Sequence, residues 1–397
     1  MKYDFAIIGS GIIGLTLAFK LKQKFKNSKV LIIEKESDSI SHGSGRNSGV
    51  LHSGIYYEPG SLRANLCTNG VKELKEYVKT EKLWIDECGK LLIPTSKFSY
   101  SNLENLFKRA KNNGVEIHKI KNNEIEKLEP NVNCQFDYGL HVPVTAVADP
   151  KEVSSSLIKN LKKMHVDLQY NTKILKIIEN KLITKDYAIE AGQIFNCAGQ
   201  FADEVAKKSN LRFRYSFLPF KGKYWKIKNE NFKLNHLIYP IPDLRYPFLG
   251  LHSSHNRYGD FYIGPSSTPV FGREQYKGFF GESVSESLSI FLNFSKKIIF
   301  NENKLRSLSV RELSLLTKQG FFNEIKKMFK NIRADELELS NQKIGIRSQI
   351  FDPQSKSLVN DFVVINQNYT THVLNAISPA WTASFAFAEY LIDQAKL

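Results

Sequence analysis

Apolar residues at the start of the chain fall in short runs separated by a helix-like stretch. Residues 3–8 and 29–33 are short and almost wholly apolar, which is typical of buried strands. Residues 15–25 carry apolar side chains at helical spacing and end in lysines. Gly9-Ser10-Gly11-Ile12-Ile13-Gly14 stands between the first strand and the helix, and Glu34 follows the second strand. The pattern predicts a βαβ unit with a glycine-rich turn.

The rest of the chain alternates between helical and strand-like patterns. Helices are predicted at residues 62–82, 103–113, 124–128, 150–164, 283–333 and after Pro379. Strands are predicted at residues 89–94, within 166–196, within 215–265 and at 345–364. Residues 41–60 are rich in Gly, Ser, His and Asn, and we expect an extended loop there rather than a packed element.

This order of elements predicts an α/β protein with two interleaved domains. A doubly wound, Rossmann-like domain is expected to bind the cofactor, and a second domain built on an antiparallel sheet is expected to bind the substrate. The first would comprise residues 1–88, 145–214 and 345–397, and the second residues 89–144 and 215–344.

The composition is that of a globular protein with no need of a disulfide framework. The chain has 397 residues, of which 42% are hydrophobic and 24% charged, so it can bury a large core. Its four cysteines, Cys67, Cys88, Cys134 and Cys197, are widely spaced and form no C-x-x-C pair. This spacing predicts a reducing compartment, the cytoplasm, and neither a metal site nor a secreted scaffold. We also expect no signal peptide and no transmembrane span.

The glycine-rich turn has the full context of a dinucleotide-binding fingerprint. Gly9 permits the tight turn, Gly11 lets the backbone approach a pyrophosphate, and Gly14 allows close helix–strand packing. The helix that begins near Ile12 presents free N–H groups to phosphates, and Glu34 would accept hydrogen bonds from ribose hydroxyls. The turn alone leaves FAD and NAD open.

The segment after Glu34 resembles a known family of flavoproteins. Residues 41–57, SHGSGRNSGVLHSGIYY, are similar to the signature of the D-amino-acid-oxidase-like FAD superfamily and, more narrowly, of the L-2-hydroxyglutarate dehydrogenase/oxidase family. Further matches follow in order along nearly the whole chain. They are 59–62 (PGSL), 89–91 (GKL), 219–224 (PFKGKY), 237–243 (LIYPIPD), 264–265 (GP), 345–349 (GIRSQ) and 375–380 (NAISPA).

This resemblance implies FAD as the cofactor and oxidation of an L-2-hydroxy acid as the activity, most specifically L-2-hydroxyglutarate to 2-oxoglutarate. A hydride would pass from C2 to flavin N5, and oxygen, a quinone or a carrier protein would reoxidise the flavin. The chain departs from the family where Lys221 and Lys223 replace the usual Arg and Glu, and where residues 145–150 follow the broader superfamily. These departures bear on the substrate, because a charged substrate could be recognised at Lys221 and Lys223.

Catalytic and substrate-binding roles are implied for five residues. His52 is expected near the flavin, either as the base that takes the hydroxyl proton or as a flavin contact without proton transfer. Arg347 would grip the substrate carboxylate bidentately, and a structural salt bridge is the alternative. The further substrate-binding candidates are Lys221, Tyr239 and His252.

The cofactor-binding set implied by the fingerprint and the resemblance extends over the chain. Ala198 and Gly199 would form a second cofactor-contacting turn, and residues before the last helix would lie near the pyrimidine side of the flavin. The complete set is Gly9, Gly11, Ile12, Gly14, Glu34, Lys35, Ser44, Asn47, Ser48, Gly49, Ala198, Gly199, Ser378, Pro379 and Ala380.

Three features leave other functions open. The net charge of +16 is explained by compositional drift, by an anionic membrane or acidic substrate, or by nucleic acid. The near alternative is a related flavin oxidase or dehydrogenase of another hydroxy acid or an amino acid. No RNA-binding motif accompanies the charge, so a flavin-containing RNA-binding protein is a distant alternative, and a non-catalytic scaffold is another. Residues 321–332 have an amphipathic basic pattern that fits a core-facing helix better than peripheral contact with the inner membrane surface. His252 and His255 lack a third metal ligand nearby in sequence, so no metal is expected.

Overall fold

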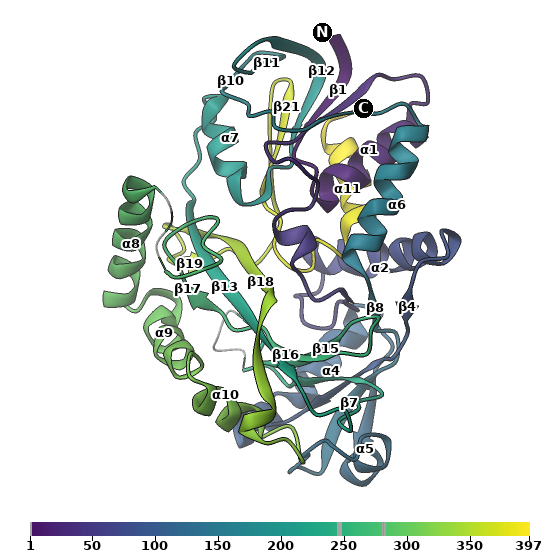
Figure 1. Ribbon diagram of the computed structural model, residues 1–397, viewed down its shortest axis with the longest axis vertical. Helices are drawn as coiled ribbons and strands as arrows, with labels where there is room; N and C mark the ends of the chain where they lie inside the picture. The colour runs from purple at the N-terminus through teal and green to yellow at the C-terminus, as the bar shows by residue number, and fades with distance from the viewer. Residues whose placement is uncertain (1, 244–247, 280, 282) are drawn as a thin grey trace.

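The computed structural model describes residues 2–243, 248–279, 281 and 283–397. The largest sheet lies at one end of the molecule, where the N-terminus also lies (Figure 1). Its strands are β10 (Lys176–Ile178), β11 (Lys181–Ile183), β12 (Ala188–Asn196), β1 (Lys2–Ile8), β2 (Val30–Ile33) and β9 (Asp167–Gln169), with β21 (Thr370–Asn375) and β20 (Val363–Gln367) attached beside β12. β1 runs parallel to β2 and β12, and β12 runs parallel to β21, as expected for a Rossmann-like sheet.

Side chains of β1 alternate between the two faces of this sheet, because successive residues of a strand point in opposite directions. Phe5 and Ile7 pack toward α1 (Ile12–Lys24), α2 (Leu62–Thr80), α6 (Pro150–Lys163) and α11 (Ser384–Gln394). Ala6 and Ile8 pack on the other face, toward β10, β11 and α7 (Ala202–Lys208). The N-terminal βαβ unit is therefore the predicted one, and the prediction of an α/β fold is confirmed.

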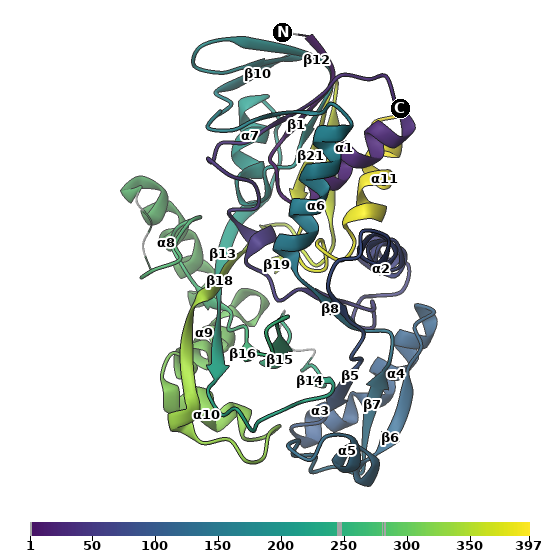
Figure 2. The same cartoon turned by 45° about the vertical axis from the view of Figure 1, so that its right-hand side comes forward.

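A long antiparallel pair, β13 (Ser216–Ile227) with β18 (Leu337–Asp352), runs from this sheet toward the other end of the molecule (Figures 1 and 2). The same sheet contains β15 (His252–His255), β16 (Phe261–Gly264), β17 (Thr268–Pro269) and β19 (Ser357–Leu358). A mixed sheet follows the order β14 (Leu237–Pro240), β5 (Lys90–Ile93), β7 (Tyr138–Val142), β6 (His118–Lys121). Helices α3 (Lys97–Ser101), α4 (Leu103–Asn112), α5 (Asn122–Leu128), α9 (Leu305–Ser314) and α10 (Lys318–Ile325) lie toward this end, and α8 (Val284–Ile299) lies near the middle of the molecule (Figure 2).

Two predictions of local structure need correction. The segment 41–60 is not simply an unpacked loop, because β3 (Val50–Leu51) pairs with β8 (Ala146–Ala148), which also pairs with β4 (Ile85–Asp86). The predicted helical region 283–333 consists of α8, α9 and α10, and the break between α8 and α9 lies where Asn301 and Asn303 adopt φ of 51° and 49°. Asparagine tolerates this left-handed conformation better than most residues, and a residue in this conformation ends a right-handed helix.

The amphipathic pattern at 321–332 belongs to the core. Phe321, Ile325, Met328 and Phe329 are buried in one hydrophobic cluster, although α10 itself ends at Ile325. The core interpretation is thus confirmed, and this segment offers no apolar face to a bilayer. Among the described residues, no helix is both long and apolar enough to cross a membrane.

Candidate functional site

A cavity of about 1320 Å³ lies where the carboxyl ends of β1 and β2 meet β13 and β18. Ordinary ligand pockets measure roughly 300–1,000 Å³, so this cavity has room for a dinucleotide together with a small substrate. Most of the predicted site residues line this cavity. They are Gly9, Gly11, Ile12, Glu34, Lys35, Ser44, Asn47, Ser48, His52, Ala198, Gly199, His252, Arg347, Ser378, Pro379 and Ala380.

The glycines of the turn serve different purposes. A Cβ on Gly9 would lie 2.6 Å from the carbonyl oxygen of Cys197, and one on Gly14 would lie 2.0 Å from that of Gly9. Gly14 does not line the cavity, so it serves the packing of the turn, as its place in the fingerprint indicates. A Cβ on Gly11 would meet, among the described atoms, the Oγ of Ser44 at 3.1 Å. No side chain at Gly11 therefore separates the backbone from the cavity.

The start of α1 is a ready-made anion site. Its N-cap, Gly11, offers no side-chain cap, and the N–H of Ile12 donates to the Oγ of Ser44 at 2.9 Å. The remaining N–H groups of the first turn and the helix dipole favour a phosphate group. Glu34 is fixed beside them, because its carboxylate accepts hydrogen bonds from the Ser10 N–H at 2.8 Å and from the Glu36 N–H at 3.0 Å. It retains lone pairs for sugar hydroxyls.

The segment after η1 (Gly43–Gly45) is held by its own polar side chains. Asn47 donates from Nδ2 to the Ser44 carbonyl at 2.7 Å and accepts from the Gly49 N–H at 2.8 Å. Gly49 has φ of 76°, and its Cβ would lie 2.2 Å from the carbonyl oxygen of Ala148. Gly49 therefore permits the pairing of β3 with β8 and is not among the residues that line the cavity, and its contact with the cofactor stays a prediction.

His52 faces the cavity as a neutral imidazole. Its backbone N–H donates to the Oγ1 of Thr382 at 3.1 Å, which ties the segment to the residues before α11. Its Nδ1 is buried and has no hydrogen-bond partner in the part of the chain that is described. Burial, with the charges of Lys90, His252 and Arg63, lowers the pKa of His52 to about 3. The ring is therefore unprotonated at neutral pH.

Arg347, on β18, extends into the same cavity. Its guanidinium bonds to the hydroxyl of Ser267 and lies 4.9 Å from the centroid of the Phe248 ring. The Ser267 N–H in turn donates to the buried carboxylate of Glu312 at 2.5 Å. No carboxylate among the described residues forms a salt bridge with Arg347. The structural salt bridge that was the alternative for this residue is thus absent from the described chain, and the guanidinium remains available for an anion.

The other substrate-binding candidates divide into two groups. His252 lines the cavity, and its ring stacks on that of Tyr239 with centroids 4.0 Å apart. Tyr239 stands behind His252 and does not line the cavity. Lys221 also fails to line it, because its neighbours Gly222 and Tyr224 do and successive side chains of a strand alternate. The ammonium of Lys221 instead bonds to the carbonyl of Gly278. The placement of Lys221 does not favour substrate contact, which stays a prediction.

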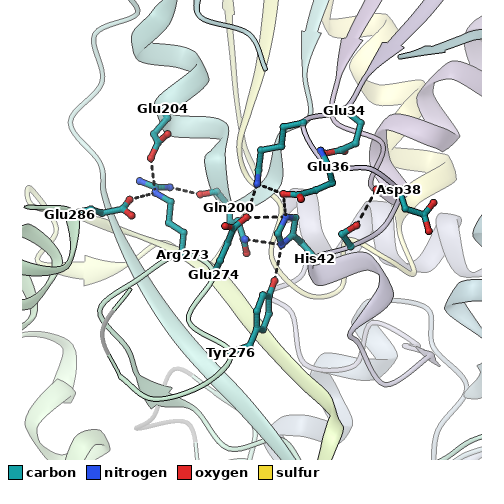
Figure 3. A network of polar contacts seen from close by, with 12 residues as sticks. Glu34, Glu36, Asp38, His42, Gln200, Glu204, Arg273, Glu274, Tyr276 and Glu286 are labelled. Carbon is teal, nitrogen blue, oxygen red and sulfur yellow. Dashed lines mark hydrogen bonds and ion pairs between the residues drawn. The ribbon is translucent and has the colours of Figure 1, made fainter. Parts of the chain in front are cut away.

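A polar network joins the glycine-turn end of the cavity to the segment after β17 (Figure 3). His42 lies at its centre, with Nδ1 2.7 Å from the hydroxyl of Tyr276 and Nε2 3.1 Å from Glu274. Lys35 pairs with Glu274 at 2.6 Å, so its charge is already engaged although the residue lines the cavity. Arg273 forms a bidentate pair with Asp203, at 2.7 Å and 2.9 Å. These contacts close one side of the cavity.

Comparison with known proteins agrees with this geometry. A model of the family described as FAD dependent oxidoreductase matches residues 4–394. The chain belongs to this family. The oxidoreductase is 31% identical over 400 residues to the L-2-hydroxyglutarate dehydrogenase of Escherichia coli strain K12, covering 99% of this chain and 93% of that protein. It is 30% identical to the mitochondrial L-2-hydroxyglutarate dehydrogenase of Homo sapiens, covering 99% of this chain and 89% of that protein.

Solved structures show the same fold at lower identity. The FAD-bound L-α-glycerophosphate oxidase of Mycoplasma pneumoniae superposes with a TM-score of 0.77 at 20% identity, covering 100% of this chain and 95% of that chain. The glycine oxidase of Geobacillus kaustophilus superposes with a TM-score of 0.74 at 13% identity, with 100% and 95% covered. These two chains establish the fold of the oxidoreductase.

The residues of the oxidoreductase fit its cofactor. The bare backbone at Gly11, the open N-terminus of α1 and the fixed carboxylate of Glu34 suit the pyrophosphate and ribose of FAD. The segment Ser378–Ala380 and the polar loop around Ser48 line the cavity nearer to His52. FAD is thus the cofactor, and the contact of each residue with it remains a prediction.

Several residues of the site escaped the sequence analysis. Thr382 anchors His52, Glu312 orders the Ser267–Arg347 pair, and His42 organises the network of Figure 3. No local motif marks Thr382 or Glu312, since each acts through a contact more than 40 residues away in sequence. His42 lies within the recognised segment 41–57 and could have been nominated from it.

The two histidines of β15 do not contribute to the same site. His252 faces the cavity, whereas the Nε2 of His255 lies 2.8 Å from Asp86. Asp86, Cys88 and His255 have ligand-type atoms within 4.8 Å of one another. The sequence-based expectation of no metal therefore stays a prediction.

Proposed function

We propose that this oxidoreductase converts L-2-hydroxyglutarate to 2-oxoglutarate. One observation carries the proposal: an arginine without a carboxylate partner among the described residues and a neutral histidine face the same cavity in a chain built for FAD. A 2-hydroxy acid needs both groups. The relatives named L-2-hydroxyglutarate dehydrogenase, matched over nearly their whole length, support the choice of this acid.

The roles of the protein residues follow from their placement. Bound FAD supplies the acceptor for the hydride that leaves C2 of the substrate. Arg347 binds the carboxylate next to C2, because a guanidinium matches a carboxylate with two parallel hydrogen bonds. An unprotonated ring nitrogen of His52 takes the proton of the 2-hydroxyl group as the carbonyl forms. Thr382 holds the backbone of His52, and Ser267 orients Arg347.

The test is anaerobic addition of L-2-hydroxyglutarate to the FAD-loaded protein. We expect rapid loss of the absorbance of oxidised flavin, and none with the D enantiomer, because Arg347 and His52 fix which face of C2 presents its hydrogen. L-amino acids should also fail, and this separates the main alternative, an amino acid oxidase like several structural neighbours. An FAD-loaded protein that keeps its colour with the L acid would refute the named substrate, and a wider panel of hydroxy acids would follow.

The electron acceptor and the location belong to the same proposal. We infer a cytoplasmic protein that contacts the inner membrane surface and whose flavin is reoxidised by oxygen, a quinone or a carrier protein. The apolar face comes from α8 and α9 rather than from the predicted segment 321–332. It consists of Val284, Leu288, Leu292, Ile299, Phe300, Val310 and Leu313, each at least 54% exposed. Exposed Lys296, Lys304 and Arg306 border it, which suits anionic lipid headgroups.

Vesicle binding tests this surface. Replacing Leu288 and Leu292 together by glutamine is expected to weaken sedimentation with phosphatidylglycerol-containing vesicles by about tenfold, since two exposed leucines lose their burial in the interface. The matched control replaces Leu175 and Ile178, which are 50% and 46% exposed on the far sheet. Equal binding by both double variants, or binding to neutral vesicles as strong as to anionic ones, would refute the membrane face.

A further inference from the structure

Lys90 is a fully buried lysine without a partner. It lies on β5 with 0% of its surface exposed, and its Nζ has no hydrogen-bond partner among the described residues. The ammonium lies 4.8 Å from the centroid of the Tyr56 ring and 4.9 Å from that of the Tyr239 ring. Lysine is almost never fully buried unless it is paired. The position therefore calls for an anion.

The polar atoms around Lys90 are unpartnered as well. The hydroxyls of Tyr56 and Tyr239 and the Nδ1 of His52 are buried and have no partner within the described ranges. Native proteins pair nearly all such groups, so four together mark a place where a ligand or ordered water completes the bonding. Tyr56 and His52 line the cavity, and Tyr239 stacks on His252, which lines it. The cluster thus lies directly behind the cavity wall.

We propose that Lys90 determines the specificity of this enzyme for a dicarboxylate, by supplying the positive charge that the second carboxylate of the substrate requires at the Tyr56 side of the cavity. The inference rests on the proposed function and names the residue that distinguishes hydroxyglutarate from a hydroxy acid with one carboxylate. Lys90 acts through the wall formed by Tyr56 and His52, so it is a positioning residue rather than a catalytic one.

The charges of the neighbourhood favour this role. The titratable groups that face Lys90 or act on it electrostatically are His52, Tyr56, Cys67, Tyr239 and His252. None of them supplies a negative charge at neutral pH, because burial raises the pKa of Cys67 to about 12 and holds the pKa values of both tyrosines well above their usual range. In this proposal the first carboxylate engages Arg347. Arg63 also lines the cavity and acts on His52, but its guanidinium donates to the carbonyls of Asn360 and Ser378, so Lys90 is assigned to the second carboxylate.

The decisive experiment compares two substrates and two buried lysines. Lys90→Met removes the charge at nearly constant volume, and Lys221→Met is the matched control, since Lys221 is 1% exposed, has a backbone partner and lies off the cavity. We expect Lys90→Met to lower kcat/KM for L-2-hydroxyglutarate about tenfold, because the ammonium acts on the second carboxylate across the wall and forms no direct hydrogen bond with it. With L-2-hydroxyvalerate, which has one carboxylate and the same carbon chain, kcat/KM should change little. Lys221→Met should alter neither.

Two further measurements separate this role from a structural one. The melting temperature of Lys90→Met without ligand should equal or exceed that of the wild type, because the variant removes an unpaired buried charge. Burial lowers the pKa of Lys90 to about 7, so the free enzyme loses this charge as the pH rises. The kcat/KM for L-2-hydroxyglutarate should therefore fall above about pH 7 in the wild type and lose this dependence in Lys90→Met.

Each outcome decides the inference. An equal loss for both substrates, or no loss for either, would overturn it. If the wild type oxidises no hydroxyglutarate, the proposed function fails, and calorimetric binding of glutarate and valerate to the FAD-loaded protein then decides the role of Lys90. Tight binding of glutarate that Lys90→Met weakens would uphold it, whereas equal binding of both acids, or of neither, would overturn it.

Discussion

Replacing Arg347 by methionine is expected to lower kcat/KM for L-2-hydroxyglutarate about a thousandfold, corresponding to about 4 kcal/mol. The substrate carboxylate enters a cavity in which Arg347 forms no salt bridge with any described carboxylate, although Glu312 acts on it electrostatically from behind Ser267. Without the guanidinium, that carboxylate loses two charge-assisted hydrogen bonds and is left desolvated. Steady-state kinetics of the FAD-loaded variant measures the loss, and most of it should appear in KM if substrate dissociation is fast.

Lysine at position 347 separates charge from geometry. It retains the positive charge but forms no bidentate pair, so Arg347→Lys should recover part of the activity and remain well below the wild type. The absorbance spectrum of bound flavin should be unchanged in both variants, since the proposed partner of Arg347 is the substrate. If the methionine variant retains activity close to that of the wild type, the carboxylate is bound elsewhere in the cavity.

The sequence predicted the cofactor end of the site well because its determinants are local. The glycine turn, the start of α1 and Glu34 lie within 26 residues of one another, and a strand–turn–helix–strand order leaves little freedom in their placement. Gly49 was assigned to the cofactor from the same kind of motif. In the structure Gly49 permits strand pairing, because the carbonyl of Ala148 occupies the space that a side chain would fill, and its cofactor contact stays a prediction.

The substrate end was predicted less completely because it depends on pairing between distant strands. Side chains of β13 alternate between the two faces of the sheet, so the face of each depends on its position along the strand. The pairing of Gly222 with Gly345, which fixes this register, could not be predicted from the sequence. Lys221 was therefore nominated although it points away, and Lys90 went unnoticed although it lies behind His52. An isolated lysine at the start of a strand carries no local sign that its ammonium will be fully buried.

The break at Asn301 shows a third limit. Apolar spacing continues through residues 283–333, and periodicity alone favours one helical region. The turn between α8 and α9 arises from asparagines that accept a left-handed backbone, which a hydrophobic pattern does not register. The break bears on the proposed membrane contact, because α8 and α9 carry exposed apolar side chains whereas the apolar side chains at 321–332 are largely buried.

Replacing His52 by glutamine is expected to lower kcat about a thousandfold, within the range for loss of a general base. Glutamine has a similar size and can hydrogen-bond, but it cannot take the hydroxyl proton. The flavin content and spectrum should stay those of the wild type if His52 acts on the substrate. His255→Gln is the control, since His255 pairs with Asp86 and does not line the cavity.

The pH profile distinguishes a base from a mere flavin contact. Because burial lowers the pKa of His52 to about 3, its ring is unprotonated above that value. The wild type should therefore show no acid limb in kcat/KM between about pH 5 and pH 7, where an ordinary histidine would titrate. An acid limb near the ordinary pKa of histidine would show that His52 is not the buried neutral base inferred from its surroundings. A glutamine variant with near-normal kcat and a shifted flavin spectrum would assign His52 to the cofactor instead, and the hydroxyl proton would then have to leave by another group lining the cavity.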